Sequence, residues 1–487
     1  MFSINMDYEK IGLKAGLEIH QQLDTHKLFC DCPNLLRKDT PAFEVKRKLN
    51  PVVGETGQVD IAALYEKEKD KTFIYQVYDT NCLVELDEEP PHEINKEAVK
   101  IALHISMLLN CKIFPITQIM RKTVVNGSNT SGFQRTALIA HDGYIETSQG
   151  KVGIDYVFLE EDSARPASKS EDDDPELEES KTYKLDRLGI PLVEIATGPH
   201  MHTPEQIKEA ALKIGEILRS AKVMRGIGTI RQDLNISIKG SERVEIKGFQ
   251  DPKIMIQTID NEIERQEECV KKKVCKKEVR RCLPNATTEF LRPMPGSSRM
   301  YPETDVPLLK ISREMINHAK ETLPRLTSEN KSYLEEFGLN EELISLILKE
   351  KRVDSFKTLV NSGIKNYSLI AKSLTLFQKD ISIKENKPIQ EISNILNLDI
   401  LESILQEVEK NNISENDVKN VMQKIAKGEK LEEAIKKESI NLKEEIEKLI
   451  KQKPGLSEGA YMGLVMAKFK GKVSGKEVSD ELRKLVK

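Results

Sequence analysis

The chain of 487 residues contains no uninterrupted apolar run of about 18 residues, the length that a membrane-spanning helix needs. Its N-terminal segment, MFSINMDYEK, also lacks the basic and then apolar pattern of a secretory signal peptide. A strong excess of one charge is missing as well, because the formal net charge is only -4. These absences predict a cytosolic protein without a membrane segment, in which any contact with RNA comes from a local basic patch.

The composition is that of a folded globular protein. Hydrophobic residues make up 38% of the chain and charged residues 32%, which excludes an intrinsically disordered protein. A chain of 487 residues is too long for one hydrophobic core and predicts two to four domains.

The common nucleotide-binding loops are missing too. No G-x-x-x-x-G-K-[ST] sequence occurs, and no G-x-G-x-x-G sequence follows a strand-like segment. The best glycine-rich alternative is RKTVVNGSNTSGFQRT, Arg121 to Thr136, which is rich in small hydrogen-bonding residues and has arginine near both ends. That composition fits a loop that cradles phosphate, and a Gly/Ser/Asn hairpin explains it nearly as well.

Seven cysteines in a cytosolic chain indicate reduced thiols or metal ligands rather than disulfide bonds. Cys30 and Cys32 could form half of a zinc site, with Cys82 and a fourth ligand such as Cys111 or His92 completing it. The remaining three cysteines, Cys269, Cys275 and Cys282, are expected on one lysine-rich helix. Because no second close-spaced pair is present, buried free thiols are favoured over zinc.

Acidic residues recur inside short strand-like segments of the N-terminal part, where an unpaired ionised carboxylate is costly to bury. In GLEIHQQL, Glu18 and His20 share one face of a strand, roughly 6–7 Å apart at about 3.3 Å per residue. Glu194 lies within PLVEIA, with apolar residues on both sides. Glu160 and Glu161 are adjacent, so strand alternation predicts that at most one of them belongs to a shared site unless a bulge intervenes.

Two further segments repeat this pattern. RQDLNISIKG alternates apolar residues with Arg231, Asp233 and Asn235, and VEIKG does so with Glu245 and Lys247. An amphipathic sheet with one solvated side explains any single segment. Together the segments predict a shared divalent-cation site, and oxygen-rich ligands with one imidazole favour magnesium, which commonly serves phosphate chemistry.

The character of the sequence changes near residue 310. Before that point most of the glycine and proline occurs, with strand-like segments between occasional helices. Two of these helices have clear N-terminal caps, at Asn95 and at Thr203. The rest of the chain is rich in Lys, Glu, Leu and Ile and predicts helices throughout.

We therefore predict an α+β protein in three domains: an antiparallel-sheet cradle over residues 1–310, a helical connector over 311–390 and a helical tail over 391–487. The last 37 residues hold nine Lys and Arg against four Asp and Glu. This basic bias fits contact with a nucleic-acid backbone, although a solvated helical face would look similar.

The motifs resemble a known family. GLEIHQQLDTHKLFCDCP, CLVELDEEPPHEIN, RKTVVNGSNTSGFQRT, FLEEDSAR, LDRLGIPLVEIATGP, IRQDLNISIKG and PGSSRMYPETDVP closely resemble the E-type subunits of archaeal glutamyl-tRNA(Gln) amidotransferases, in the same order, over residues 16–310. The segment YMGLVMAKFKGKVSGKEVSDELRKL resembles the helical tail domain that this family shares with the B-type subunits of the related bacterial enzyme.

The resemblance implies a reaction in two steps. ATP phosphorylates the γ-carboxylate of glutamate mischarged on tRNA(Gln), and ammonia then displaces the phosphate to give Gln-tRNA(Gln). ATP and Mg2+ are the implied cofactors. The implied partner is an asparaginase-like amidase that delivers ammonia through a channel, in an assembly with two copies of each protein.

The resemblance also implies roles for residues at matching positions. The implied catalytic residues are Glu18, His20, Glu161, Glu194, Arg231 and Asp233. The implied metal ligands are Glu18, His20, Glu160, Glu161, Glu194 and Glu245. The implied phosphate- and nucleotide-binding residues are Ser128, Asn129, Ser131, Gly132, Gln134, Arg135, Asn235 and Lys247.

This chain departs from the family in one respect. Members of the family carry a large insertion, similar to a domain of bacterial aspartyl-tRNA synthetase, before the FLRPMPGSSRMYPETD segment. Here only the short lysine-rich stretch from Cys269 to Leu283 occupies that interval. Two other functions remain open: a B-type subunit of a three-subunit amidotransferase, and a non-catalytic adaptor that binds tRNA.

Overall fold

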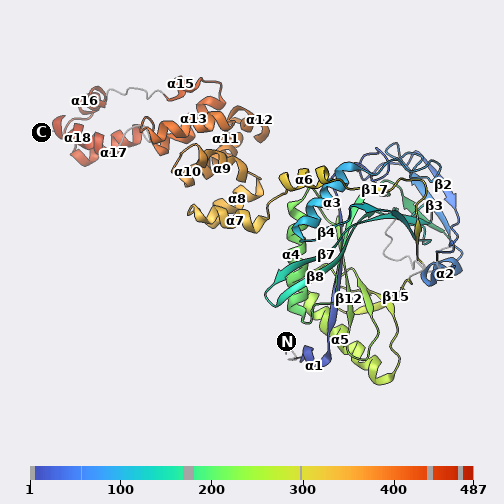
Figure 1. Ribbon diagram of the computed structural model, residues 1–487. Helices are drawn as coiled ribbons and strands as arrows, with labels where there is room; N and C mark the ends of the chain where they lie inside the picture. The colour runs from blue at the N-terminus through green and yellow to red at the C-terminus, as the bar shows by residue number, and fades with distance from the viewer. Residues whose placement is uncertain are drawn as a thin grey trace. The chain divides into compact units, whose positions relative to one another are not determined.

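The computed structural model describes residues 6–55, 57–167, 180–296, 299–435, 442–469 and 475–485. The chain divides into two compact units, residues 1–326 and 327–487. The first unit is built on a large sheet and the second is helical (Figure 1). The predicted α+β class is confirmed.

The main sheet of the first unit has eleven strands in the order β15-β14-β13-β12-β1-β11-β8-β7-β6-β16, with β4 paired to β7. Neighbouring strands run antiparallel except β13 and β14, which are parallel. The strands are β1 (Lys14–Gln22), β4 (Lys112–Ile113), β6 (Ile119–Thr123), β7 (Phe133–Thr147), β8 (Gly150–Glu161), β11 (Pro191–Thr197), β12 (Ile230–Ser237), β13 (Val244–Lys247), β14 (Glu278–Cys282), β15 (Thr288–Pro293) and β16 (Met300–Pro302).

Among the residues that the structure describes, two smaller sheets and six α-helices complete this unit. The four-stranded sheet has the order β2-β3-β10-β9, and β17 pairs with β5. These strands are β2 (Phe43–Arg47), β3 (Thr72–Val77), β5 (Ile116–Thr117), β9 (Arg165–Pro166), β10 (Ser180–Lys184) and β17 (Leu309–Lys310). The helices are α1 (Tyr8–Ile11), α2 (Ile61–Glu68), α3 (Lys96–Leu108), α4 (Pro204–Ser220), α5 (Met255–Lys272) and α6 (Arg313–Glu321).

Helices α3, α4 and α5 lie along the outer side of the curved main sheet (Figure 1). Their apolar stripes pack on residues such as Leu17 and Ile19 in one buried cluster. The predicted caps are confirmed, since the Asn95 side chain accepts from Ala98 N at 3.0 Å and Thr203 Oγ1 accepts from Gln206 N at 3.2 Å. Because side chains alternate along a strand, this packing leaves Glu18 and His20 on the other, concave side of the sheet.

The two ends of the strand order are close in sequence. β15 ends at Pro293 and β16 begins at Met300, although they are the opposite edges of the eleven-stranded sheet. A connection of this length spans at most about 25 Å when fully extended. The sheet must therefore curl until its edges approach one another, which encloses the concave side.

The second unit consists of helices throughout its described residues. They are α7 (Thr327–Glu336), α8 (Glu341–Lys349), α9 (Val353–Asn361), α10 (Tyr367–Leu374), α11 (Leu376–Glu385), α12 (Ile389–Ile395), α13 (Leu398–Glu409), the 3-10 helix η2 (Glu415–Asp417), α14 (Val418–Ala426), α15 (Leu431–Ile435), α16 (Leu442–Gln452), α17 (Glu458–Lys468) and α18 (Gly475–Leu485).

Two apolar clusters stabilise these helices. One contains buried residues from Leu334 to Ala434, and the other contains buried residues from Ile446 to Leu482. The first cluster includes both Ile381 and Ile392, on either side of the predicted domain boundary at residue 390. The division into three domains remains a prediction.

The expectation of one helix carrying Cys269, Cys275 and Cys282 is wrong. α5 ends at Lys272, and Lys273 adopts a left-handed conformation with φ +58° that terminates the helix. Cys282 instead lies in β14, which pairs with β13 and β15. Strand pairing with distant segments overrides the helical tendency of this lysine-rich stretch.

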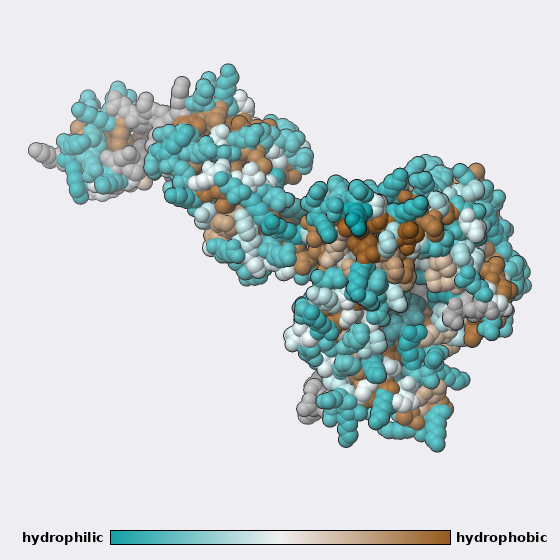
Figure 2. Space-filling view, in the orientation of Figure 1, coloured by the Kyte–Doolittle hydropathy of each residue, from teal (hydrophilic) through white to brown (hydrophobic). Residues whose placement is uncertain are grey.

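No helix among the described residues is long and apolar enough to cross a membrane. Figure 2 shows hydrophilic side chains over most of the displayed face of each unit.

A glycine in the β6–β7 connection provides a test of local packing. Gly127 has φ +90°, and a Cβ there would lie 2.1 Å from Cδ1 of the buried Phe73. We expect Gly127→Ala to lower the free energy of unfolding by about 2–5 kcal/mol, because backbone strain and overpacking add. Gly150→Ala is the control, with φ +111° and no described atom within 4 Å, and should cost only about 1–2 kcal/mol. Equal losses in denaturant titrations of the two variants would contradict this packing.

Candidate functional site

The concave side of the main sheet carries a continuous group of charged residues, here called the polar face. The strand register explains why they meet. His20 in β1 is paired with Glu194 in β11, and Glu18 is paired with Asp233 in β12. The polar face consists of Glu18, His20, Lys122, Glu160, Glu194, Asp233, Glu245 and Lys247.

His20 lies at the centre of three carboxylates. Its Nε2 atom is 3.3 Å from Glu194 Oε2, 3.5 Å from Glu18 Oε1 and 3.7 Å from Glu160 Oε1. Ligand atoms of Glu18, His20 and Glu194 all lie within 4.8 Å of one another. The structure thus brings residues from two of the predicted segments into a group that could hold a metal ion, with Glu160 of a third segment beside it.

Lys122 belongs to the same group and was missed in the sequence. Its Nζ atom is 2.7 Å from Glu160 Oε2 and 3.2 Å from Glu194 Oε2. β6 pairs with β7, and β7 pairs with β8, so Lys122 and Glu160 face each other across two strand boundaries. The sequence signal was only that Lys122 lies near the start of the glycine-rich segment, and its pairing partner could not be read from the sequence.

These contacts shift the proton affinities of the group. Burial and the charge of Glu194 raise the pKa of Glu18 to about 7. Burial disfavours the charged form of His20, but the hydrogen bond and charge of Glu194, with Glu18 and Glu160, raise its pKa to about 9. Burial also disfavours ionisation of Glu194, yet Lys122 and His20 hold its pKa well below the usual range. Burial raises the pKa of Glu160. The group therefore combines a carboxylate whose pKa is lowered, Glu194, with side chains whose pKa is raised, Glu18, His20 and Glu160.

A second ion-pair group continues the polar face towards β13. Lys247 Nζ is 2.7 Å from Asp233 Oδ2 and 2.6 Å from Glu245 Oε1. The predicted nucleotide-binding residue Asn235 is paired with Glu245 in the sheet register. Burial disfavours the ammonium, but Asp233 and Glu245 raise the pKa of Lys247, so the charged form is retained.

Glu160 and Glu161 point to opposite faces, as strand alternation predicts. Arg135 Nη1 is 3.4 Å from Glu161 Oε2, and Arg135 Nε donates to Glu303 Oε2 at 2.8 Å. Arg121 Nη2 donates to Glu303 Oε1 at 2.6 Å. Glu161 therefore does not share the face of His20, and the guanidinium of Arg135 is engaged in buried ion pairs.

Arg231 is also paired within the protein. Its Nη2 atom donates to Asp162 Oδ1 at 2.8 Å, and Asp162 is fully buried. Gln22 Nε2 donates to Asp162 Oδ2 at 2.6 Å. Arg231 thus positions the end of β1 next to the polar face.

The predicted phosphate-cradling loop is the connection of the β6–β7 hairpin. Its hydrogen bonds are mostly internal: Ser128 Oγ donates to Asn126 Oδ1 at 2.7 Å, Ser131 Oγ donates to Phe133 O at 3.0 Å, and Gly132 N donates to Asn129 O at 3.1 Å. Gln134 Nε2 donates to Glu160 Oε1 at 2.9 Å. The hairpin alternative therefore accounts for most of this segment.

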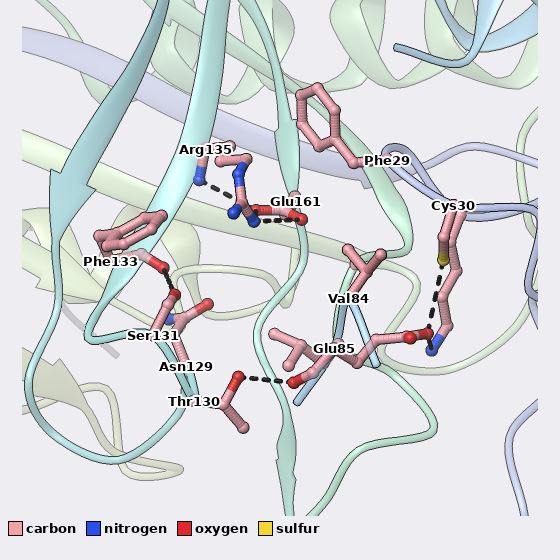
Figure 3. Close-up of a pocket in the computed structure, with 13 residues that line it drawn as sticks. Phe29, Cys30, Val84, Glu85, Asn129, Thr130, Ser131, Phe133, Arg135 and Glu161 are labelled. Atoms are coloured by element: carbon pink, nitrogen blue, oxygen red, sulfur yellow. Dashed lines mark hydrogen bonds and ion pairs between the residues drawn. The ribbon is translucent and has the colours of Figure 1, made fainter. Parts of the chain in front are cut away.

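This hairpin lines a small cleft with a volume of about 20 Å³. Figure 3 shows Arg135 and Glu161 turned towards each other on one side, and Thr130 bonded to the backbone of Glu85 on the other. Asn129 also lines the cleft, and its Oδ1 atom is buried without a hydrogen-bond partner in the described structure.

A thiol cluster lies beside this cleft. Sulfur atoms of Cys30, Cys32 and Cys82 and a carboxylate oxygen of Glu85 are within 4.8 Å of one another. The predicted fourth ligand, Cys111 or His92, is wrong, because Glu85 occupies that place. Glu85 also forms a buried ion pair with Lys27. No sequence signal singled out Glu85. It lies only three residues after Cys82, but a turn is needed to bring its carboxylate to the three thiols.

The thiols of this cluster differ in acidity. The hydrogen bond with Cys32, together with burial, raises the pKa of Cys30. The same hydrogen bond lowers the pKa of Cys32. Burial and Glu85 raise the pKa of Cys82 to about 12. The donor set fits zinc by type, but the ammonium of Lys27 already compensates the charge of Glu85.

The fold and the polar face occur within a region that matches a family described as "GatB/GatE catalytic domain", over residues 13–317. The chain belongs to the GatB/GatE family.

Relatives from archaea match almost the whole chain. A protein of Methanocaldococcus jannaschii is 36% identical over 641 aligned positions, which cover 99% of this chain and all of the relative. Proteins of Sulfurisphaera tokodaii and Saccharolobus solfataricus are 32% and 33% identical, each with 99% of both chains covered. All three are named as the E-type subunit of glutamyl-tRNA(Gln) amidotransferase.

The first alignment also shows a difference in length. It has 641 positions whereas this chain has 487 residues, so at least 154 positions hold no residue of this chain. That gap agrees with the missing insertion predicted from the sequence.

Glu303 lies at the centre of the ion pairs on the face opposite His20, which also include Arg121, Arg135 and Glu161. We expect its removal to lower the stability of the protein strongly. Glu303 is 1% exposed and bonded to both Arg121 and Arg135. Glu303→Gln should lower the free energy of unfolding by about 3–5 kcal/mol, because it removes the buried carboxylate that two guanidinium groups share and leaves them, among the described residues, only Glu161 at 3.4 Å and the exposed Asp305 at 3.1 Å. The control is Glu289→Gln, which removes an exposed ion pair with Arg281 and should cost at most about 1 kcal/mol. Denaturant titrations measure the free energy of unfolding of both variants, provided that its dependence on denaturant concentration is the same. A loss for Glu303→Gln as small as that for Glu289→Gln would contradict these buried ion pairs.

Proposed function

We propose that this chain is the subunit of a cytoplasmic glutamyl-tRNA(Gln) amidotransferase that activates and amidates the glutamate carried by tRNA(Gln). The cluster of Glu18, His20 and Glu194 supports this most strongly, because it lies inside the matched catalytic region and joins residues from separate strands. The names of the relatives support the substrate.

The reaction has two balanced steps. An oxygen of the glutamate γ-carboxylate attacks the γ-phosphorus of ATP and ADP leaves, which gives an acyl phosphate. Ammonia then attacks the acyl carbon, phosphate leaves, and a proton is released as the amide forms. Both steps bring anions together, so the site must offset negative charge and hold the reactants in line.

The polar face has the donors for a magnesium ion: several carboxylate oxygens and one imidazole, with ligand atoms within 4.8 Å of one another. Glu18, His20, Glu160 and Glu194 would hold the ion, and Glu245 would lie further along the face. When bound, magnesium would neutralise charge on the phosphates. Lys122 and Lys247 supply fixed positive charge on either side of this cluster.

Several residues have structural rather than direct roles in this proposal. Glu161 and Arg135 hold the β7–β8 pair from the opposite face, and Arg231 holds Asp162. Ser128, Asn129, Ser131 and Gly132 shape the hairpin next to Glu160. These residues position the reacting groups without contacting them.

The proposed assembly pairs this protein with an asparaginase-like amidase that supplies ammonia, with two copies of each. A B-type subunit of a three-subunit amidotransferase is the alternative, and copurification of an asparaginase-like protein distinguishes the two. A non-catalytic adaptor is disfavoured by the complete carboxylate cluster, and ATP hydrolysis dependent on Glu-tRNA(Gln) would exclude it.

We propose that the thiol cluster consists of free thiols with Lys27 as the counter-ion of Glu85. Zinc is the alternative. Metal analysis of the purified protein and of Cys82→Ser decides between them, because a stoichiometric zinc content that the variant loses would establish the zinc site.

Substitution of the proposed metal ligands tests the chemical role of the polar face. Glu18→Gln and His20→Ala should abolish ATP-dependent formation of Gln-tRNA(Gln), since the metal-binding donors are lost. The affinity for tRNA should stay within a few-fold, because these side chains act on phosphate transfer. His92→Ala, at an exposed histidine in the same unit, is the control and should retain wild-type activity. Near-normal turnover of either ligand variant at limiting magnesium would refute the assignment.

The tail can be tested by a deletion placed between the two helical clusters. Removing residues 436–487 leaves the cluster from Leu334 to Ala434 complete, which a cut at residue 391 would divide. We expect weaker tRNA binding and a higher KM for Glu-tRNA(Gln), with ATP binding unchanged. Each lost phosphate contact should make the salt dependence of binding shallower by roughly 0.7–0.9 in log–log slope. An unchanged affinity and slope would remove the tail from the tRNA-binding surface.

A further inference from the structure

Two arginine side chains next to the polar face form no ion pair within the described residues. The side chain of Arg292 forms no hydrogen bond there either, and the side chain of Arg299 forms one, from Nε to Thr123 O at 3.3 Å. Both side chains are half-buried. Arg231, by contrast, is engaged by Asp162, and on the opposite face of the sheet Arg121 and Arg135 are engaged by Glu303.

The connection between the sheet edges brings these two arginines together. Arg292 belongs to β15 at one edge, and Arg299 directly precedes β16 at the other. Gly296, between them, donates its backbone N–H to Asp60 Oδ2 at 2.8 Å, which anchors the connection next to α2. Burial lowers the pKa of Arg292, and the charge of Arg299 lowers it further, while the carboxylates of Glu245, Glu66 and Asp60 oppose this lowering.

Both arginines also border the carboxylates. Met300 is paired with Lys122, so Arg299 directly precedes the residue that lies alongside Lys122. In the sheet register, Glu245 is paired with Val279 and Val279 with Arg292, so Arg292 lies about 10 Å from Glu245 at the backbone, within reach of its own side chain.

The carboxylates of the polar face lie beside the guanidinium groups of Arg292 and Arg299. A ligand that binds both must therefore carry positive and negative charge next to each other. A free anion or an RNA phosphate would be repelled by the five carboxylates of the polar face. A metal-bound triphosphate presents a cation to the carboxylates and several anionic oxygens to the guanidinium groups, which bind phosphate in a fork geometry.

We propose that Arg292 and Arg299 bind the terminal phosphates of a metal-bound nucleoside triphosphate at the rim of the polar face. This inference rests on the proposed function for the site and identifies residues that neither the strand pattern nor the family resemblance singled out. The unpaired guanidinium groups exchange mutual repulsion for charge-assisted hydrogen bonds when the triphosphate binds.

The test is nucleotide binding by the full-length protein copurified with its partner, in the presence of magnesium. ATP, ADP, AMP and inorganic tripolyphosphate are titrated against wild type, Arg292→Gln and Arg299→Gln. Each variant should bind ATP and tripolyphosphate at least about tenfold more weakly, the effect of losing a charged hydrogen bond, whereas AMP affinity should change less than about twofold. Arg281→Gln, on the neighbouring strand and paired with exposed Glu289, is the control and should bind all four as wild type.

Folding and RNA binding are measured on the same proteins. The nucleotide-free Arg292→Gln protein should be no less stable than wild type, because a repulsive contact is removed, and tRNA affinity should stay within about twofold. Unchanged ATP affinity, an equal loss for ATP and AMP, or a loss confined to tRNA would each overturn the inference.

These outcomes are independent of the proposed reaction. If wild type amidates Glu-tRNA(Gln) and both arginine variants bind ATP normally, the inference fails and the proposed function stands. If wild type does not amidate Glu-tRNA(Gln) but loses triphosphate affinity in both variants, the inference stands and the proposed function fails.

Discussion

The balance of buried charge on the polar face is the constraint on which the rest of the first unit depends. Glu160 is 1% exposed and Glu194 is 7% exposed, and ionised carboxylates at that depth require compensation. Lys122 and His20 provide it at distances of 2.7–3.7 Å. These partners come from β1, β6, β8 and β11, so the charge balance exists only when four strands are in register. Correct pairing of the sheet and assembly of the site are thus the same event.

The two faces of the main sheet have different roles, one in packing and one in binding. The outer face packs α3, α4 and α5 over a continuous apolar cluster, which supplies the stability. The concave face holds charges that cost stability but can bind a cation and phosphates. On the opposite face of β6 and β7, Glu303 fixes Arg121 and Arg135 in place, whereas Arg292 and Arg299, beside the two edges of the sheet, form no ion pair among the described residues.

The chain is shorter than its archaeal relatives by an internal stretch, yet the strands that carry the polar face are all present. In this protein α5 is followed directly by β14, and β14 joins the sheet edge next to β13. The sheet is therefore complete without any inserted domain.

The sequence alone determined the α+β class, the two helix caps, the alternation that puts Glu18 and His20 on one face and separates Glu160 from Glu161, and the family. These properties depend on local periodicity and on motifs that neighbouring residues carry. It did not reveal Lys122, Glu85 as the neighbour of the three cysteines, or the engagement of Arg135 by Glu303. Each of these depends on which distant strand or turn lies alongside, because a side chain's partner across a sheet is set by register and curvature. Only the tertiary structure decided which charges meet, and that Arg292 and Arg299 form no ion pair among the residues it describes.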